Sequence, residues 1–74
     1  MDAVMILVFK TSLQTKRDCR RLAPLLNSRT DIEQWTVDLT DCDKVLRVVS
    51  AGTLATTIET MVRAIGFDCC ELAD

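Results

Sequence analysis

The sequence predicts an α+β fold of the ferredoxin-like type: a four-stranded antiparallel sheet with two helices on one face, in the order βαββαβ. Each half of the chain has an apolar strand pattern, then an amphipathic helix pattern, then a further strand, which doubles a strand-helix-strand unit. The chain has 74 residues, 49% of them hydrophobic, with one Pro and two Gly. That length supports one small core and leaves no linker, so we expect residues 1–74 to form a single domain.

The first half is expected to begin with a strand over residues 3–10, which is apolar on both faces. Thr11 and Ser12 are candidate caps for a helix over residues 14–27. The apolar stripe of this helix consists of Cys19, Leu22, Ala23 and Leu26. Pro24 removes a backbone donor inside the helix, which predicts a kink there or an early end.

The second half is expected to begin with an alternating strand over residues 32–39, joined by a polar hairpin loop to a strand over 45–50. Thr53 is the predicted N-cap of the second helix. Its apolar stripe consists of Leu54, Ile58, Met61, Val62 and Ile65. Gly66 can adopt the left-handed conformation that ends a helix, and a last strand is expected over residues 67–72.

Composition excludes several classes of function. The formal charge of -2 disfavours a nucleic-acid binder, which must neutralise many phosphates. The apolar start at residues 4–9 is too short to cross a membrane and carries no export signal, so we expect a cytoplasmic protein. There is no His, no Gly-rich phosphate loop and no aromatic platform for bases. We therefore expect neither an enzyme nor a bound cofactor.

The apolar skeleton of the chain from Ile32 onward resembles that of the heavy-metal-associated domains of copper chaperones and metal-ATPase tails. Its positions are Ile32, Trp35, Val37, Leu39, Leu46, Val48, Ile58, Val62, Ile65, Gly66 and Phe67. The resemblance implies a loop after the first strand that carries a Met and two Cys separated by two residues. Here the loop contains Leu13 in place of the Met, and neither ligand position is Cys. Cys19 lies beyond the second ligand position, so the ligand role is not transferred to it.

The four cysteines allow two interpretations. In this topology Cys19, Cys42 and either Cys69 or Cys70 should gather at one end of the sheet. With Asp41 and Asp43 beside them, they could hold a soft ion such as Cu(I) or Zn(II). The stronger expectation is that they are reduced core or half-exposed thiols and that no metal is bound, because Cys69 and Cys70 should point to opposite faces of one strand.

Basic residues are concentrated around the first loop and helix. They are Lys10, Lys16, Arg17, Arg20 and Arg21. Cations in the first turn of a helix are disfavoured by the helix dipole, so helix stability does not explain this arrangement. By resemblance to copper chaperones, the cluster implies a surface that docks on an acidic protein partner. A solvated helix face offset by Asp18, Asp41 and Asp43 is an equally strong alternative.

Two helices cover only one face of the predicted sheet, and its other face remains apolar. The residues expected on this open face are Val4, Ile6, Val8, Val45 and Val49. Burial of such side chains favours a sheet-to-sheet homodimer or a bound protein partner. The alternative is a monomer whose open face is wetted by Gln34, Thr36, Asp38 and Arg47.

The sequence as a whole predicts a small domain similar to heavy-metal-associated domains, acting as a non-catalytic protein-interaction or dimerisation module. The alternative is a soft-metal carrier that uses the thiols of Cys19, Cys42 and Cys69. No nucleic-acid or membrane partner is expected.

Overall fold

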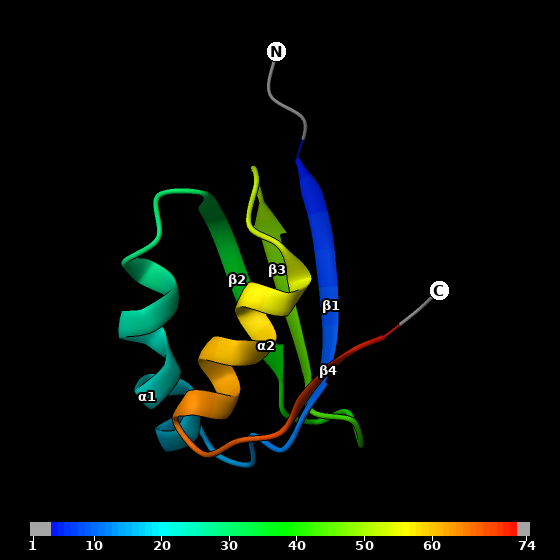
Figure 1. Cartoon of the computed structure of the whole chain (residues 1–74). Helices are drawn as coiled ribbons and strands as arrows, with labels where there is room; N and C mark the ends of the chain where they lie inside the picture. Colours follow the sequence, from blue (N-terminus) through cyan, green and yellow to red (C-terminus); the bar gives the residue numbers. More distant parts are fainter. Residues whose placement is uncertain (1–3, 73–74) are drawn as a thin grey trace.

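The computed structural model describes residues 4–72 and contains six elements in the predicted order (Figure 1). They are β1 (Met5–Thr11), α1 (Lys16–Asn27), β2 (Ile32–Asp38), β3 (Val45–Ser50), α2 (Ala55–Ala64) and β4 (Cys69–Glu71). Ala3, the first residue of the predicted first strand, lies outside the described residues. Neither helix in the described part of the chain has the length and hydropathy needed to span a bilayer.

The four strands form one antiparallel sheet in the order β2-β3-β1-β4. Strands β1 and β3 lie in the centre, and β4 pairs only with residues 9–11 of β1. In Figure 1 both helices lie in front of the sheet, so they cover the same face. The predicted ferredoxin-like sandwich is therefore confirmed.

The core lies between the sheet and the two helices. Alternation along the strands sends Leu7 and Phe9 of β1 toward the helices, and Met5 has the same parity but is 58% exposed near the end of the strand. The other buried hydrophobic residues are Leu13, Leu22, Leu26, Leu46, Val48, Ile58, Val62 and Cys69. Each helix contributes two of them at i and i+4, which is the spacing of one helix face.

The start of α1 differs from the prediction. Its N-cap is Thr15, whose hydroxyl accepts a hydrogen bond from the backbone N of Asp18 at 3.2 Å. The Asp18 carboxylate accepts in return from the backbone N of Thr15 at 3.3 Å, which completes a capping box. Thr11 and Ser12 are not caps, because Thr11 belongs to β1 and Ser12 bonds to Asp68.

Pro24 does not end α1 early, because the helix continues to Asn27. The donor that Pro24 lacks would have bonded to the carbonyl of Arg20, one turn earlier. Arg20 and Pro24 are both exposed, so this carbonyl lies on the solvent side of the helix, where water can satisfy it.

The two ends of α2 differ in how well they were predicted. Thr53 is not the N-cap: it is buried, and its backbone N donates to the Ser50 hydroxyl at 2.7 Å. Leu54 takes the cap position without a side-chain bond and is 69% exposed, so it does not belong to the core stripe.

At the other end Gly66 has the predicted left-handed conformation, with φ of 94°. The backbone N of Gly66 donates to Arg63, and that of Phe67 donates to Val62, in the bonding pattern of a Schellman motif. Phe67 belongs to this motif and Asp68 bonds to Ser12, so β4 begins at Cys69, later than the predicted residue 67.

Candidate functional site

The loop that follows β1 is held in place by hydroxyl groups. Thr11 is buried, and its Oγ1 donates to the Lys44 carbonyl at 2.6 Å and accepts from the Leu13 backbone N at 3.2 Å. Ser12 Oγ accepts from the Asp68 backbone N at 2.8 Å. Leu13 is fully buried, as expected for a residue in place of a core Met. This loop therefore joins the β2–β3 hairpin and the turn before β4 to the end of β1.

The first turn of α1 contains a pair of positions separated by two residues, directly after the buried Leu13. These positions are Thr15 and Asp18, and the resemblance to heavy-metal-associated domains implies a pair of Cys with this spacing here. In this chain the two side chains bond to each other's backbone, and Asp18 Oδ2 also accepts from the Gln14 backbone N at 3.0 Å. The loop is thus closed by a helix cap whose side-chain atoms are oxygens. Oxygen is a hard metal ligand and binds a soft ion poorly.

The four cysteine thiols are free and lie in different environments. Cys69 is buried, and this burial, together with the nearby charge of Glu59, raises its pKa to about 12. Cys19 is half-buried, and burial followed by the charge of Asp18 raises its pKa. Cys42 and Cys70 are exposed, so Cys69 and Cys70 lie on opposite sides of β4, as predicted.

The predicted gathering of thiols is only partly correct. The segments do meet at one end of the sheet: Thr11 pairs with Cys69 across β1 and β4, and its backbone N donates to Asp43 in the hairpin loop at 3.0 Å. The sulfur atoms, however, do not converge. Cys69 and Cys70 both line an open hollow of about 500 Å³, whereas Cys42 lines another of about 400 Å³, and the segment from Thr11 to Ser12 lines both hollows.

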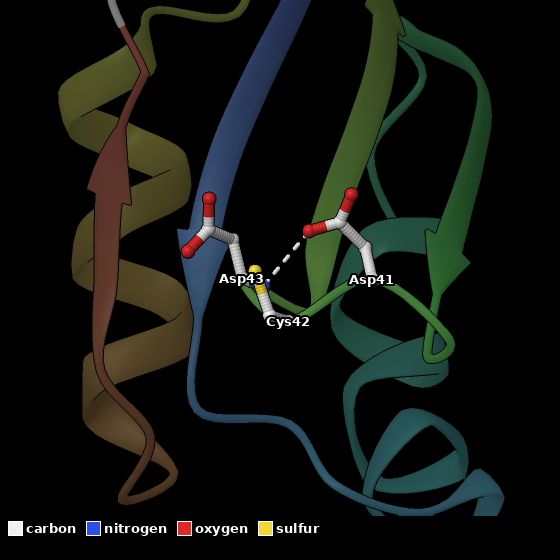
Figure 2. Close-up of side chains that lie close together, drawn as sticks. All are labelled: Asp41, Cys42 and Asp43. Carbon is white, nitrogen blue, oxygen red and sulfur yellow. Dashed lines mark hydrogen bonds between the residues drawn. The ribbon is translucent and has the colours of Figure 1, made fainter.

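Within residues 4–72, one group of three potential ligand side chains exists, and it lies in the β2–β3 hairpin loop. Its members are Asp41, Cys42 and Asp43, whose ligand atoms lie within 4.8 Å of one another (Figure 2). Asp41 Oδ1 accepts from the Asp43 backbone N at 2.8 Å, which folds the loop on itself. The predicted set of Cys19, Cys42 and Cys69 is therefore wrong as a three-thiol site, because the hairpin group includes only one thiol.

All five members of the basic cluster around α1 are exposed, and two of them, Arg21 and Lys10, contact other elements. Arg21 Nη2 donates to the carbonyl of Ile65 at 3.1 Å, and its guanidinium lies 5.2 Å from the centre of the Phe67 ring. Arg21 thus joins α1 to the end of α2, a contact that the sequence did not indicate because the residues are far apart in the chain. Lys10 Nζ lies 3.8 Å from Asp43 Oδ1. Lys16, Arg17 and Arg20 form no side-chain hydrogen bond or ion pair within residues 4–72.

The residues predicted for the open face of the sheet alternate along their strands with the buried core residues, as expected. Ile6 and Val4 are 64% and 51% exposed, and Val8, Val45 and Val49 are half-buried. The strand register arranges this face in rows across the sheet. The first row is Ile6, Val49 and Gln34, and the second is Val8, Arg47 and Thr36. In the third row Cys70 pairs with Lys10 and Val45 pairs with Asp38.

The comparisons with known proteins place the fold. No family model and no curated protein matches the sequence. The structure is similar to the apo form of the heavy-metal-associated domain of a copper chaperone for superoxide dismutase, with a TM-score of 0.78 and 11% identity, over 99% of this chain and 71% of that one.

Two further solved structures are similar over nearly their whole length. The yeast copper transporter domain Ccc2a has a TM-score of 0.79 and 15% identity, over 93% of this chain and 96% of that one. A putative copper-ion-binding protein from Bacillus anthracis has a TM-score of 0.78 and 14% identity, over 95% of this chain and 100% of that one. Identities this low establish the fold and leave the activity open. The chain therefore has the ferredoxin-like βαββαβ fold of heavy-metal-associated domains, as its apolar skeleton predicted.

Proposed function

We propose that this chain is a non-catalytic, single-domain protein-interaction module of the cytoplasm that binds a protein through the open face of its sheet. The observation that carries the proposal is the exposure of Ile6, at 64%, in a central strand beside Val8 and Val49. A monomeric sheet exposed to water on one face normally carries polar residues there. Contiguous aliphatic side chains on a rigid sheet instead favour burial against another protein.

The first turn of α1 argues against the metal-carrier role that similar domains have. Thr15 and Asp18 occupy the pair of positions where the resemblance implies thiols, and their side chains are used in a helix cap. Cys69 is buried and protonated at neutral pH because its pKa is about 12. A thiol binds a soft ion as the thiolate, so Cys69 is unsuited to this task.

The proposal is tested by comparing the parent chain with Ile6→Lys and with Lys16→Glu, which changes an exposed residue outside the open face. Each variant is used as bait for chemical cross-linking in cell extract and is also measured for self-association by sedimentation. Ile6→Lys should lose the protein contacts that the parent and Lys16→Glu retain. If all three chains cross-link and sediment alike, the open face is not a binding surface and the proposal fails.

A second candidate function is transport of a soft ion centred on Cys42. It is favoured by the close approach of the Asp41, Cys42 and Asp43 ligand atoms, and by similar solved structures that include a copper transporter domain in a Cu(I)-loaded state. Titration of the reduced protein with Cu(I) and Zn(II) tests it. A carrier should bind one ion per chain and lose it in Cys42→Ser, whereas Cys70→Ser should leave the stoichiometry unchanged. A stoichiometry near zero for the parent chain excludes this function.

A further inference from the structure

Strand β1 has a gap beside it along half of its length. On the side of β4 it is paired only at residues 9–11, and the last backbone bond there within residues 4–72 joins the Leu72 N to the Val8 carbonyl at 2.8 Å. Peptide groups along a strand point alternately to its two edges, so the N–H and C=O of Ile6 face the same side as the Val8 carbonyl. In the described chain no strand lies beside this upper part of β1 (Figure 1). Ile6 therefore presents a donor and an acceptor that no strand of this sheet pairs.

The large apolar side chains that remain exposed are concentrated at this gap. Residues 4–72 include five exposed large hydrophobic residues, and four of them border the gap: Val4, Met5, Ile6 and Leu72. Met5 is the most informative, because its parity directs it to the helix side of the sheet and it is nevertheless 58% exposed. Apolar side chains are thus exposed on both sides of the sheet here. An added strand would cover both sides, whereas a partner on the open face would cover only one.

The other edge of the sheet, formed by β2, has features that prevent pairing. Its register shifts between Ile32 and Gln34, as in a β-bulge, and it carries the charged residues Glu33 and Asp38. Bulges and charges are common means by which proteins block the addition of a strand to an edge. Residues 4–8 contain no charge and no proline. The sheet is therefore protected at one edge and open at the other.

We propose that the gap beside β1 accepts an extended segment of another protein, which adds a short strand to the sheet. Hydrogen bonds to the peptide groups of Ile6 position this segment, and its alternate side chains cover Met5 on one side and Ile6 on the other. The segment is therefore aliphatic and uncharged, and it has no proline at the bonded positions. This site is the edge of a strand, so it goes beyond the proposed function, which concerns the open face.

A second copy of β1 matches the gap less well than a separate segment does. Antiparallel pairing of Ile6 with Ile6 of a second copy would put Val4 of that copy beside Val8, where Leu72 already bonds. A separate segment has no such restriction, because it can take any register and end beside Leu7. The gap along residues 4–7 then holds a strand of about four residues, or about 13 Å.

The experiment measures amide hydrogen exchange by NMR in the full chain, with the end-blocked peptide Lys-Thr-Val-Ile-Val-Thr-Lys as the probe. The terminal lysines keep the peptide soluble and lie outside its aliphatic centre. Without peptide, the Ile6 amide should exchange at least about tenfold faster than the Leu7 amide, which faces β3. Saturating peptide should slow exchange at Ile6 by about tenfold or more and leave Leu7 unchanged. The same peptide methylated on its three central amide nitrogens keeps its side chains but loses the donors, so it should give no protection.

Two variants distinguish an added strand from other contacts. Met5→Lys puts a charge beside the gap on the helix side of the sheet, away from the open face, and should weaken peptide binding by about fivefold or more. Ala64→Lys, which also adds a positive charge, changes an exposed residue at the end of α2. It should leave the affinity within about twofold of the parent. Equal affinities in the two variants would show that the peptide binds elsewhere.

Four further results would overturn the inference. Slow exchange at Ile6 without peptide means that the chain itself closes the gap. An absence of protection at millimolar peptide means that the edge accepts no strand. Equal protection by the methylated peptide means that side chains alone hold it. Protection that appears when the chain alone is concentrated, together with a dimer in sedimentation, means that a second copy occupies the gap.

These outcomes are separate from those of the proposed function. That function is tested by the loss of protein contacts in Ile6→Lys, and it stands if those contacts are lost while the Ile6 amide gains no protection from peptide. A partner then binds the side chains of the open face and adds no strand. If Ile6→Lys retains every contact and peptide gives no protection, both proposals fail.

Discussion

At the scale of single residues, burial decides what each thiol of this chain can do. Cys69 lies in the core beside Glu59, and both burial and that negative charge favour its neutral form. Cys42 and Cys70 are exposed to solvent. Thiol reactivity follows the accessible thiolate, so the four cysteines should differ widely in the rate at which they are modified.

Alkylation of the folded protein at pH 8 should therefore modify Cys42 and Cys70 first. Cys69, with a pKa of about 12, has roughly one thiolate in ten thousand molecules at this pH and is covered by the fold. It should react only when the protein opens, at a rate on the order of 100-fold or more below that of an unfolded peptide. Mass spectrometry of digests taken over time measures each rate. Rapid modification of Cys69 before unfolding would contradict its buried position.

The pair Thr15 and Asp18 gives a second test at this scale. The double change Thr15→Cys and Asp18→Cys places two thiols with the spacing that the resemblance implies for a metal site. It should create binding of one Cu(I) per chain, while loss of the cap should lower the free energy of unfolding by about 1 kcal/mol. Competition with a chromogenic chelator measures the binding. Thr15→Cys alone should lose the cap without gaining a site, and equal affinity in both variants would contradict the prediction.

At the scale of the elements, the backbone conformation of one residue just beyond α2 determines where that helix ends. Gly66 has a φ of 94°, in a region that L-residues with a Cβ disfavour, and a Cβ added there would meet no atom within 4 Å. A substitution at this position therefore changes backbone strain and little else. Gly52 also has free space around it but does not have a positive φ.

This pair of glycines is a matched test of the Schellman motif. Gly66→Ala should lower the free energy of unfolding by about 1–2 kcal/mol, the cost of a left-handed conformation with a Cβ. Gly52→Ala should be neutral or should stabilise by up to about 1 kcal/mol, because it restricts the unfolded chain. Urea denaturation followed by circular dichroism measures both. Equal effects at the two positions would show that strain at Gly66 does not determine the helix end.

Hydrophobic pattern and turn chemistry predicted most of the fold. Alternation placed β3 at residues 45–50, where the structure has it, and Gly66 was recognised as the helix stop. The errors concern polar residues with several possible partners. Thr53 was expected to cap α2, but the Ser50 hydroxyl already accepts from its backbone N, so the helix begins after Leu54.

The candidate site was less predictable than the fold. The thiol-bearing segments were correctly expected at one end of the sheet, because topology alone determines which loops meet. Whether two sulfur atoms converge depends on where each side chain points, and here Cys42 lines a different hollow from Cys69 and Cys70. The capping box did have a sequence signal, since Asp18 follows Thr15 by three residues.

At the scale of the whole molecule, a chain of 74 residues depends on every buried side chain. A domain of this size buries only about 60% of the surface that its unfolded chain exposes, so its net stability is small. Ile58 of α2 is fully buried in the single core, whereas Ile6 of β1 is 64% exposed on the other side of the sheet. The same residue type thus occurs in two opposite environments.

Truncation of these two isoleucines should therefore have very different effects. Ile58→Ala should lower the free energy of unfolding by about 2–5 kcal/mol, through lost burial and the cavity left behind. Ile6→Ala should change it by less than about 0.5 kcal/mol in protein dilute enough for sedimentation to show a monomer. Thermal denaturation at micromolar concentration compares the two. A large effect of Ile6→Ala under these conditions would mean that the face it occupies is covered within the single chain.

The capping box at Thr15 and Asp18 has a consequence for how the whole domain responds to its surroundings. A loop that wraps around an ion has one shape when loaded and another when empty, and a docking partner can distinguish the two. Here the same turn is closed by its own side chains, and it needs no guest to stay closed. We therefore expect this turn to keep the same contour whether copper and zinc are scarce or abundant, which would make any recognition that it takes part in constitutive.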